Sequence, residues 1–260
     1  MSSILPRFPV FIVGSPRSGT SATVDAFIAA GYRGYREGNF LPVAYQMNLA
    51  IDRHYKSFDI GTNEILLGCI DKVELKQKVN EIVFDYVDTL NPEWPWFEKT
   101  GGADMIRLLP AILLRWPSAL VVYSKRRAIE NIFSRIRKFP GESFEYHCVD
   151  WARTMNAWRQ TRQILPPAQF LEIDQYDMIR EPANTAATLG RFLELDQERE
   201  DSMLAMLEKT RPQETESGSA IRVLTLEATG WSAHQRQTFI KHCSQEMEAF
   251  GYTLDATYRS

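Results

Sequence analysis

The sequence predicts an α/β protein in which a P-loop-type parallel sheet is flanked by helices on both faces. Residues 10–13 and 119–123 are apolar runs without a polar break, which is typical of strands buried on both faces. Each run leads directly into a helical pattern, and strands that alternate with helices form parallel sheets. The 260 residues include six tryptophans, and no shift in composition divides them. We therefore expect a single domain over residues 1–260.

The first strand, loop and helix occupy residues 8–31. The loop is short and polar: it contains Gly14, Ser15, Pro16, Arg17, Ser18 and Gly19, with Thr20 and Ser21 after it. Its glycines can adopt positive φ, and the N–H groups at the start of the helix attract phosphate or sulfate. The common nucleotide loop has a lysine after the second glycine, whereas Thr20 stands there in this chain and Arg17 lies inside the loop. An ordinary Gly-Pro turn is the alternative reading.

The next stretch, residues 32–116, is predicted to be mainly helical. The polar residues 32–40 leave the core near the loop and include Glu37, and the pattern of residues 41–72 predicts short helices around a cleft. Residues 73–90 have a clear helical apolar stripe. Prolines and glycines interrupt the segment that contains Glu98 and Lys99, and a helix over residues 105–116 follows.

The second half again begins with a strand that leads into a helix. A basic helix follows the strand at residues 119–123, and a third strand is expected around residues 170–173. Further helices are expected over residues 147–165, from 182 to 193, over 203–207 and over 233–250. The polar residues 210–230 predict a long surface loop, which is either a connector or a ligand lid.

A second anion site is predicted after the second strand. Arg126 stands at the carboxyl end of that strand, where ligands of open α/β sheets bind, and Ser134 follows eight residues later. Lys138 lies one further turn along and adds charge. A solvated basic helix face is the alternative. Two anion sites at two strand ends suit an adenosine that carries both a 5′ and a 3′ phosphate.

Composition excludes several classes of protein. The net charge of −3 argues against a general nucleic-acid coat. No segment has about 18 uninterrupted apolar residues, and residues 1–6 lack the features of a signal peptide, so we expect a soluble, cytoplasmic protein without membrane contact. Cys69, Cys148 and Cys243 are interpreted as reduced thiols. Clustered Asp or His ligands are absent from the sequence, so no metal is expected.

Four stretches of the sequence resemble one family. GSPRSGTS resembles the 5′-phosphosulfate loop of the sulfotransferases that use 3′-phosphoadenosine 5′-phosphosulfate (PAPS), and Arg126 with Ser134 resembles their 3′-phosphate pair. WFEKTGG and FLEIDQYDMIREPANTAATLGRFLEL look like segments of the bacterial and tyrosylprotein branch, and AIRVLTLEATGW with the closing FGY resembles the C-terminal loop that folds over the cofactor. Two positions depart from the family pattern. Gly101 stands where the family often has proline, and Arg127-Ala128 stands where Asp-Pro is usual.

The resemblance implies transfer of a sulfuryl group from PAPS to a hydroxyl or amine, with release of adenosine 3′,5′-bisphosphate. It implies that Arg17 and Lys99 stabilise charge, that Glu37 is the base, and that Arg222 reaches the nucleotide. His54 is the second candidate for the base; Glu98, His147 and His234 are weaker alternatives. The acceptor, a small molecule, peptide or glycan, and the oligomeric state are not determined. A P-loop kinase that uses ATP and a non-catalytic nucleotide-binding module are the alternative functions.

Overall fold

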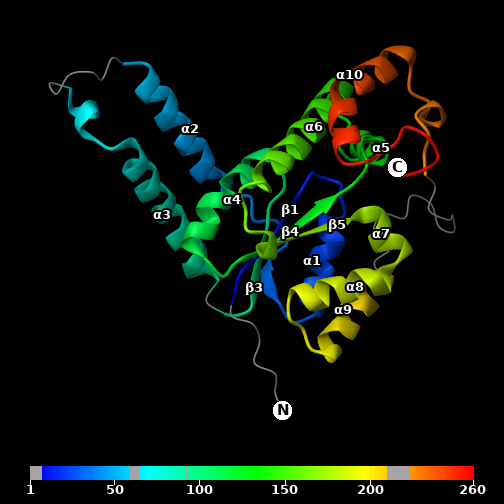
Figure 1. The fold of residues 1–260 in the computed structure, drawn as a ribbon, viewed down its shortest axis with the longest axis horizontal. Helices are drawn as coiled ribbons and strands as arrows, with labels where there is room; N and C mark the ends of the chain where they lie inside the picture. The colour runs from blue at the N-terminus through cyan, green and yellow to red at the C-terminus, as the bar shows by residue number, and fades with distance from the viewer. Residues whose placement is uncertain (1–7, 59–64, 92, 210–222) are drawn as a thin grey trace.

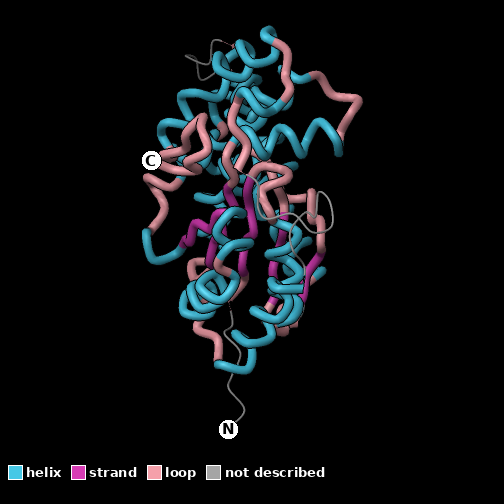
Figure 2. Tube along the Cα trace, turned by 90° about the vertical axis from the view of Figure 1, so that its right-hand side faces the viewer, coloured by secondary structure: helices cyan, strands magenta, loops and turns pink. Residues whose placement is uncertain are grey.

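The structure, a computed structural model, describes residues 8–58, 65–91, 93–209 and 223–260. Its centre is one parallel sheet, which confirms the predicted fold class. Figure 2 shows the strands in the middle of the molecule with helices around them. In the order β2-β3-β1-β4-β5, the strands are Arg33–Tyr35, Trp96–Lys99, Val10–Gly14, Leu120–Lys125 and Phe170–Asp174.

The helices cover both faces of the sheet and extend beyond it (Figure 1). They are α1 (Thr20–Ala29), α2 (Pro42–Lys56), α3 (Lys72–Leu90), α4 (Ala103–Arg115), α5 (Ala128–Lys138), α6 (Phe144–Thr161), α7 (Gln175–Arg180), α8 (Pro182–Phe192), α9 (Gln197–Lys209) and α10 (Ala233–Ala249), with short 3-10 helices at Leu66–Cys69, Pro167–Gln169 and Glu227–Thr229. Within the described ranges, each helix is either too short or too polar to cross a bilayer.

The side chains of β1 point alternately to the two faces of the sheet, and each face has its own hydrophobic core. Phe11 and Val13 point into a core that also contains side chains of α4, α6 and α10. Val10 and Ile12 point into the core on the opposite face, where α1, α8 and α9 pack. All four side chains are fully buried. This burial on both faces explains why the strand reads as an unbroken apolar run.

The parallel arrangement determines where the site lies. Because every strand runs in the same direction, the carboxyl ends of β1, β3 and β4 lie at one edge of the sheet. Gly14 pairs with Ser124 in the β1–β4 register, and Ile12 pairs with Lys99 in the β1–β3 register. The loop after β1, Lys99 and Arg126 are therefore brought to the same edge, where ligands of open α/β sheets bind.

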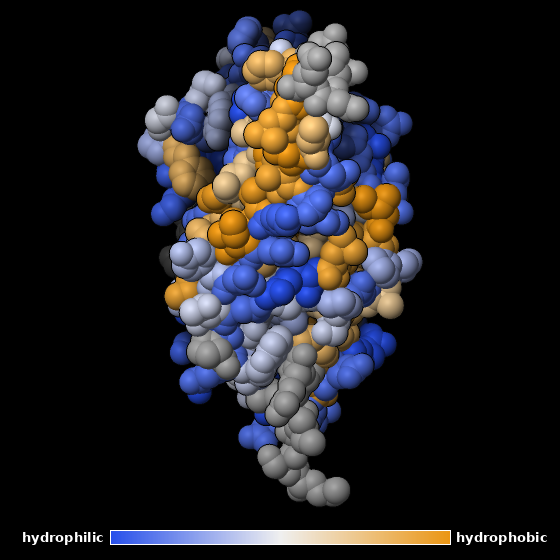
Figure 3. Space-filling model, turned by 90° about the vertical axis from the view of Figure 1, so that its left-hand side faces the viewer, coloured by the Kyte–Doolittle hydropathy of each residue, from blue (hydrophilic) through white to orange (hydrophobic). Residues whose placement is uncertain are grey.

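The α2–α3 hairpin stands beside the sheet (Figure 1). We expected several short helices over residues 41–72, but α2 alone takes up 42–56. Asn48 donates to the side chain of Asn80 at 2.9 Å, which ties α2 to α3. Figure 3 faces this side and shows apolar side chains gathered on it, and the exposed apolar residues of the two helices are Val43, Met47, Val73, Ile82, Tyr86 and Leu90.

Two strands were not predicted. β2 has three exposed residues and occupies the edge of the sheet, and β3 lies buried between β2 and β1. β3 ends in Glu98 and Lys99, two charged residues that are nevertheless buried. The strand therefore places charged side chains at the ligand-binding edge.

Candidate active site

The loop after β1 has the backbone geometry of an anion-binding turn. Gly19 has φ of 91° and is the N-cap of α1. The first hydrogen bond of the helix runs from Thr23 N–H to Gly19 O at 3.1 Å, so the preceding N–H groups of the first turn are available to a ligand. Arg17 has φ of 72°, in the left-handed region that non-glycine residues seldom adopt. Such strain is typical of functional turns.

The next elements hold this loop in place. Ser124 of β4 donates its hydroxyl to Ser18 O at 2.5 Å. Asn131 of α5 donates its side-chain N–H groups to Pro16 O at 3.0 Å and to Ser18 Oγ at 3.1 Å. The loop conformation thus depends on β4 and α5, which are more than a hundred residues away in the chain.

The two predicted anion sites are in direct contact. Arg17 Nε donates to Ser134 Oγ at 3.1 Å, and Arg126 Nη1 donates to Arg17 O at 3.1 Å. Burial, followed by the nearby Arg137, lowers the pKa of Arg17, and burial is also the largest cause of a lowered pKa at Arg126. Guanidinium groups stay charged under such conditions. An anion placed here would therefore relieve an excess of positive charge.

The hydroxyl groups of the loop differ in exposure. Ser15 and Thr20 are buried, whereas Ser21 is exposed. Ser15 Oγ has no hydrogen-bond partner among the described residues. A buried hydroxyl of this kind, next to N–H groups and arginines, suits a ligand with phosphate oxygens. Lys138, the last residue of α5, is exposed.

Lys99 and Glu37 form an ion pair at the same edge of the sheet. Lys99 ends β3 and is buried, and Glu37 follows β2 with 56% of its side chain exposed. The structure thus pairs the predicted charge-stabilising lysine with the predicted base. Burial raises the pKa of the neighbouring Glu98 to about 7. Thr100 donates its hydroxyl to Glu98 Oε1 at 2.6 Å.

His54 lies elsewhere. It is exposed in the last turn of α2, and its ring centroid is 4.9 Å from that of Phe58. That end of α2 is the one farthest from the sheet in Figure 1. The location disfavours His54 as a base for chemistry at the loop. Arg222 lies outside the described residues.

Arg127, which departs from the family's usual residue, anchors the C-terminal part of the chain. It is fully buried and pairs with Glu130, with its Nε 2.8 Å from Oε2. It also donates to Asp255 O at 2.9 Å and to Leu224 O at 2.5 Å. Two separate C-terminal segments therefore meet at the start of α5. The sequence analysis missed this role because Arg127 reads as one more cation of a basic helix.

Asp174 is a second anchor that was not predicted. It is buried at the end of β5, where it accepts from the Tyr252 hydroxyl at 2.6 Å and from the Tyr258 hydroxyl at 2.9 Å. Tyr258 also stacks on Tyr176, with ring centroids 4.1 Å apart. Tyr252 and Tyr258 thus pack at the carboxyl end of β5, where Tyr258 also accepts from Arg127 N–H at 3.0 Å.

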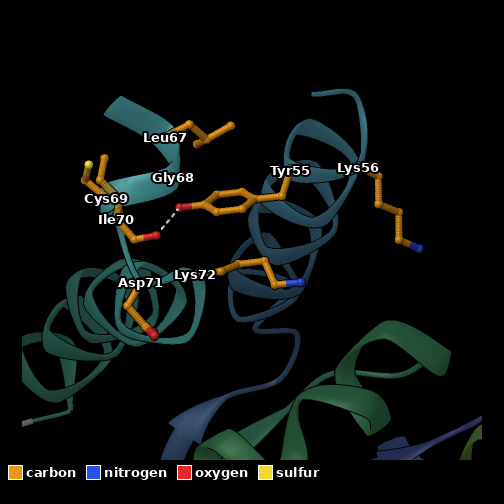
Figure 4. Close-up of a pocket in the computed structure, with 8 residues that line it drawn as sticks. All are labelled: Tyr55, Lys56, Leu67, Gly68, Cys69, Ile70, Asp71 and Lys72. Carbon is orange, nitrogen blue, oxygen red and sulfur yellow. Dashed lines mark hydrogen bonds between the residues drawn. The ribbon is translucent and has the colours of Figure 1, made fainter. Parts of the chain in front are cut away.

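A separate pocket opens at the outer end of the α2–α3 hairpin (Figure 4). The Tyr55 hydroxyl donates to Ile70 O at 2.9 Å, which joins α2 to the segment before α3. None of its lining residues belongs to the loop, to the Lys99–Glu37 pair or to α5; they are Tyr55, Lys56, Leu67, Gly68, Cys69, Ile70, Asp71 and Lys72.

The sequence model of a known protein family matches the middle of the chain. Residues 71–199 match the model described as "Sulfotransferase family". This range includes Lys99, Arg126 and Ser134, whereas Arg17 and Glu37 precede it. Contacts in the structure join these two groups of residues.

Solved structures show the same fold over nearly the whole chain. The sulfotransferase domain of the Synechococcus PCC 7002 olefin synthase is 18% identical, with a TM-score of 0.57 over 97% of this chain and 98% of that one. Sulfotransferase STF9 from Mycobacterium avium is 12% identical, with a TM-score of 0.56 over 96% and 78%. Mouse sulfotransferase SULT7A1, solved in complex with PAP, is 13% identical, with a TM-score of 0.52 over 95% and 87%.

No curated protein sequence matches the chain significantly. The family match and the fold agree with each other and with the geometry at the sheet edge. Residues 71–199 therefore belong to the sulfotransferase family, and the chain as a whole has the fold of solved sulfotransferases.

Proposed function

We propose that this enzyme transfers the sulfuryl group of PAPS to an acceptor hydroxyl or amine and releases adenosine 3′,5′-bisphosphate. The observation that carries this proposal is the hydrogen bond from Arg17 to Ser134, because it joins the loop after β1 to the pair after β4. A ligand that spans both would have anionic groups at two positions, as PAPS does. PAPS supplies the activated sulfuryl group when it is bound.

The residues of the loop and of α5 would hold the nucleotide. Backbone N–H groups at Gly19 and Thr20 would bind the 5′ phosphosulfate, together with the hydroxyl groups of Ser15, Thr20 and Ser21. Arg126 and Ser134 would bind the 3′ phosphate, which arginine contacts in bidentate fashion. Lys138 and Arg222 remain proposed contacts on the resemblance alone.

The residues at the ends of β2 and β3 would act on the acceptor. Glu37 would accept the proton of the acceptor hydroxyl or amine at its carboxylate, and the ion pair with Lys99 orients that carboxylate. Lys99 and Arg17 would stabilise the charge that develops on oxygen atoms during transfer. Phe40, three residues after Glu37 in the sequence, packs edge-to-face on Tyr86 of α3, with ring centroids 6.3 Å apart.

Other readings have less support. A P-loop kinase needs a lysine that pairs with the phosphates, and Thr20 stands at that position. Within the described residues, no three or more His, Cys, Asp or Glu side chains form a group that could hold a metal, and a metal-free reaction remains a prediction. A cytoplasmic location also remains a prediction.

Incubation with sulfur-labelled PAPS and a panel of phenols, alkyl alcohols, amines, glycans and tyrosine peptides tests the proposal. We expect label in at least one acceptor and an equal amount of adenosine 3′,5′-bisphosphate. A parallel reaction with Mg²⁺ and γ-labelled ATP is the control. Label transfer from ATP in place of PAPS would support the kinase, and nucleotide binding without transfer to any acceptor would support the non-catalytic module.

A further inference from the structure

Two backbone N–H groups of the segment that follows Glu37 donate to the end of β3 and to Thr100, the residue after it. Gly38 N–H donates to Lys99 O at 2.9 Å. Asn39 N–H donates to Thr100 Oγ1 at 2.7 Å, and the same hydroxyl donates to Glu98 Oε1 at 2.6 Å. The hydroxyl of Thr100 therefore links the backbone next to Glu37 with a buried carboxyl group.

The packing around that carboxyl group is tight. A Cβ atom on Gly38 would lie 1.8 Å from Glu98 Oε1, so the backbone of this segment lies directly against the carboxyl group. Glu98 is only 5% exposed, and its Oε2 has no hydrogen-bond partner among the described residues. Burying an incompletely bonded carboxyl group is unfavourable for folding. A role in the reaction would explain its presence at this edge.

We propose that Glu98 is a positioning residue that acts through Thr100 to hold Glu37 against Lys99. It would thereby set the rate of proton removal from the acceptor without touching either substrate. This inference rests on the proposed function, since it takes Glu37 as the base. Its sequence position alone does not reveal the role, because the contact to residues 38 and 39 exists only once β2 and β3 are paired.

The charge of Glu98 links this clamp to pH. Burial is the largest cause of a pKa of about 7; the hydrogen bond from Thr100 and the charge of Lys99 lower this pKa, and the charge of Glu37 raises it. The residues paired with Glu98 in the sheet are Phe11 in β1 and Tyr35 in β2. Below pH 7 the carboxyl group is mostly neutral, and above it a second negative charge competes with Glu37 for Lys99. The acceptor-dependent rate should therefore fall as pH rises through about 7.

Substitutions at Thr100 test the clamp. Thr100→Val keeps the shape but removes the hydroxyl group, whereas Thr100→Ser keeps the hydroxyl group. Thr154→Val is the matched control, because the Thr154 hydroxyl is buried in α6 and donates to Asp150 O at 2.8 Å. We expect Thr100→Val to lower kcat roughly 10- to 100-fold with little change in the affinity for adenosine 3′,5′-bisphosphate, as for a misplaced catalytic group. Thr100→Ser should restore most of kcat.

Two further readouts make the test decisive. Hydrogen exchange at the Asn39 amide should be at least tenfold faster in Thr100→Val than in Thr154→Val, and this readout does not need an active enzyme. Glu98→Gln should remove the fall in rate near pH 7. Unchanged exchange at Asn39 together with unchanged kcat in Thr100→Val would overturn the clamp. If the unaltered enzyme transfers no sulfuryl group, the proposed function fails, and the exchange rates still decide whether the clamp exists.

Discussion

Replacing Glu98 by Gln should change how the stability of the protein depends on pH. The pKa of this carboxyl group is about 7 in the folded protein, against 4.5 for an ordinary glutamate. The folded state therefore holds a proton that the unfolded chain has already lost between these values. Stability from this group is complete below pH 4.5 and is lost as pH rises through 7.

The size of the effect follows from the two pKa values. Each unit of difference in pKa corresponds to about 1.4 kcal/mol, so the unfolding free energy should fall by roughly 3 kcal/mol as pH rises from 4.5 to 7. Glu98→Gln cannot ionise, so it should lack this loss. Depressed carboxyl groups such as Glu172 change stability in the opposite direction, but they are common to both proteins and cancel in the comparison.

Urea denaturation of both proteins at pH 5 and pH 8 measures the effect. The difference in unfolding free energy between the two should shift by about 2–3 kcal/mol in favour of Glu98→Gln as pH rises. If the difference in unfolding free energy between the two proteins were the same at pH 5 and pH 8, a raised pKa at Glu98 would be refuted.

Three other predictions test individual residues by substitution. Arg17→Ala should lower turnover roughly a hundredfold or more while nucleotide affinity changes less, since it removes a transition-state donor; unchanged turnover in a steady-state assay would exclude that role. Glu37→Gln should lower the acceptor-dependent rate roughly a hundredfold or more, whereas His54→Ala should keep it, and the opposite result would move the base to His54. Arg127→Met should lower the unfolding free energy measured in urea by roughly 3–5 kcal/mol, because the buried Glu130 loses its ion-pair partner. The control Arg137→Met replaces an exposed arginine and should change that free energy by less than about 0.5 kcal/mol. Equal effects of the two substitutions would count against Arg127 as an anchor.

The sequence predicted the parts of the site that local chemistry determines. The apolar run before Gly14 and the glycines of the loop identify a phosphate-binding turn without any knowledge of the fold. The placement of Arg126 directly after a buried strand, with Ser134 eight residues later in the helix that follows, is likewise readable from the local pattern. Both groups lie at the predicted edge of the sheet.

Contacts between distant segments could not be predicted in the same way. β3 escaped detection because Glu98 and Lys99 break its apolar pattern, and they are buried only because β2 covers one side and β1 the other. The hydrogen bond from Arg17 to Ser134 joins residues that lie 117 positions apart in the sequence. Arg127 looks like a surface cation until residues 224 and 255 pack over it.

Calorimetric titration with adenosine 3′,5′-bisphosphate and with AMP tests the central claim, that Arg17, Arg126 and Ser134 form one site for a nucleotide with two anionic ends. We predict that the unaltered protein binds the bisphosphate far more tightly than AMP. In Arg126→Ala this preference should shrink by about 1.5–3 kcal/mol, the range for a hydrogen bond to a charged group. AMP controls for disturbance of the loop, because Arg126 also donates to Arg17 O. Equal affinity of the unaltered protein for the two nucleotides would contradict the account.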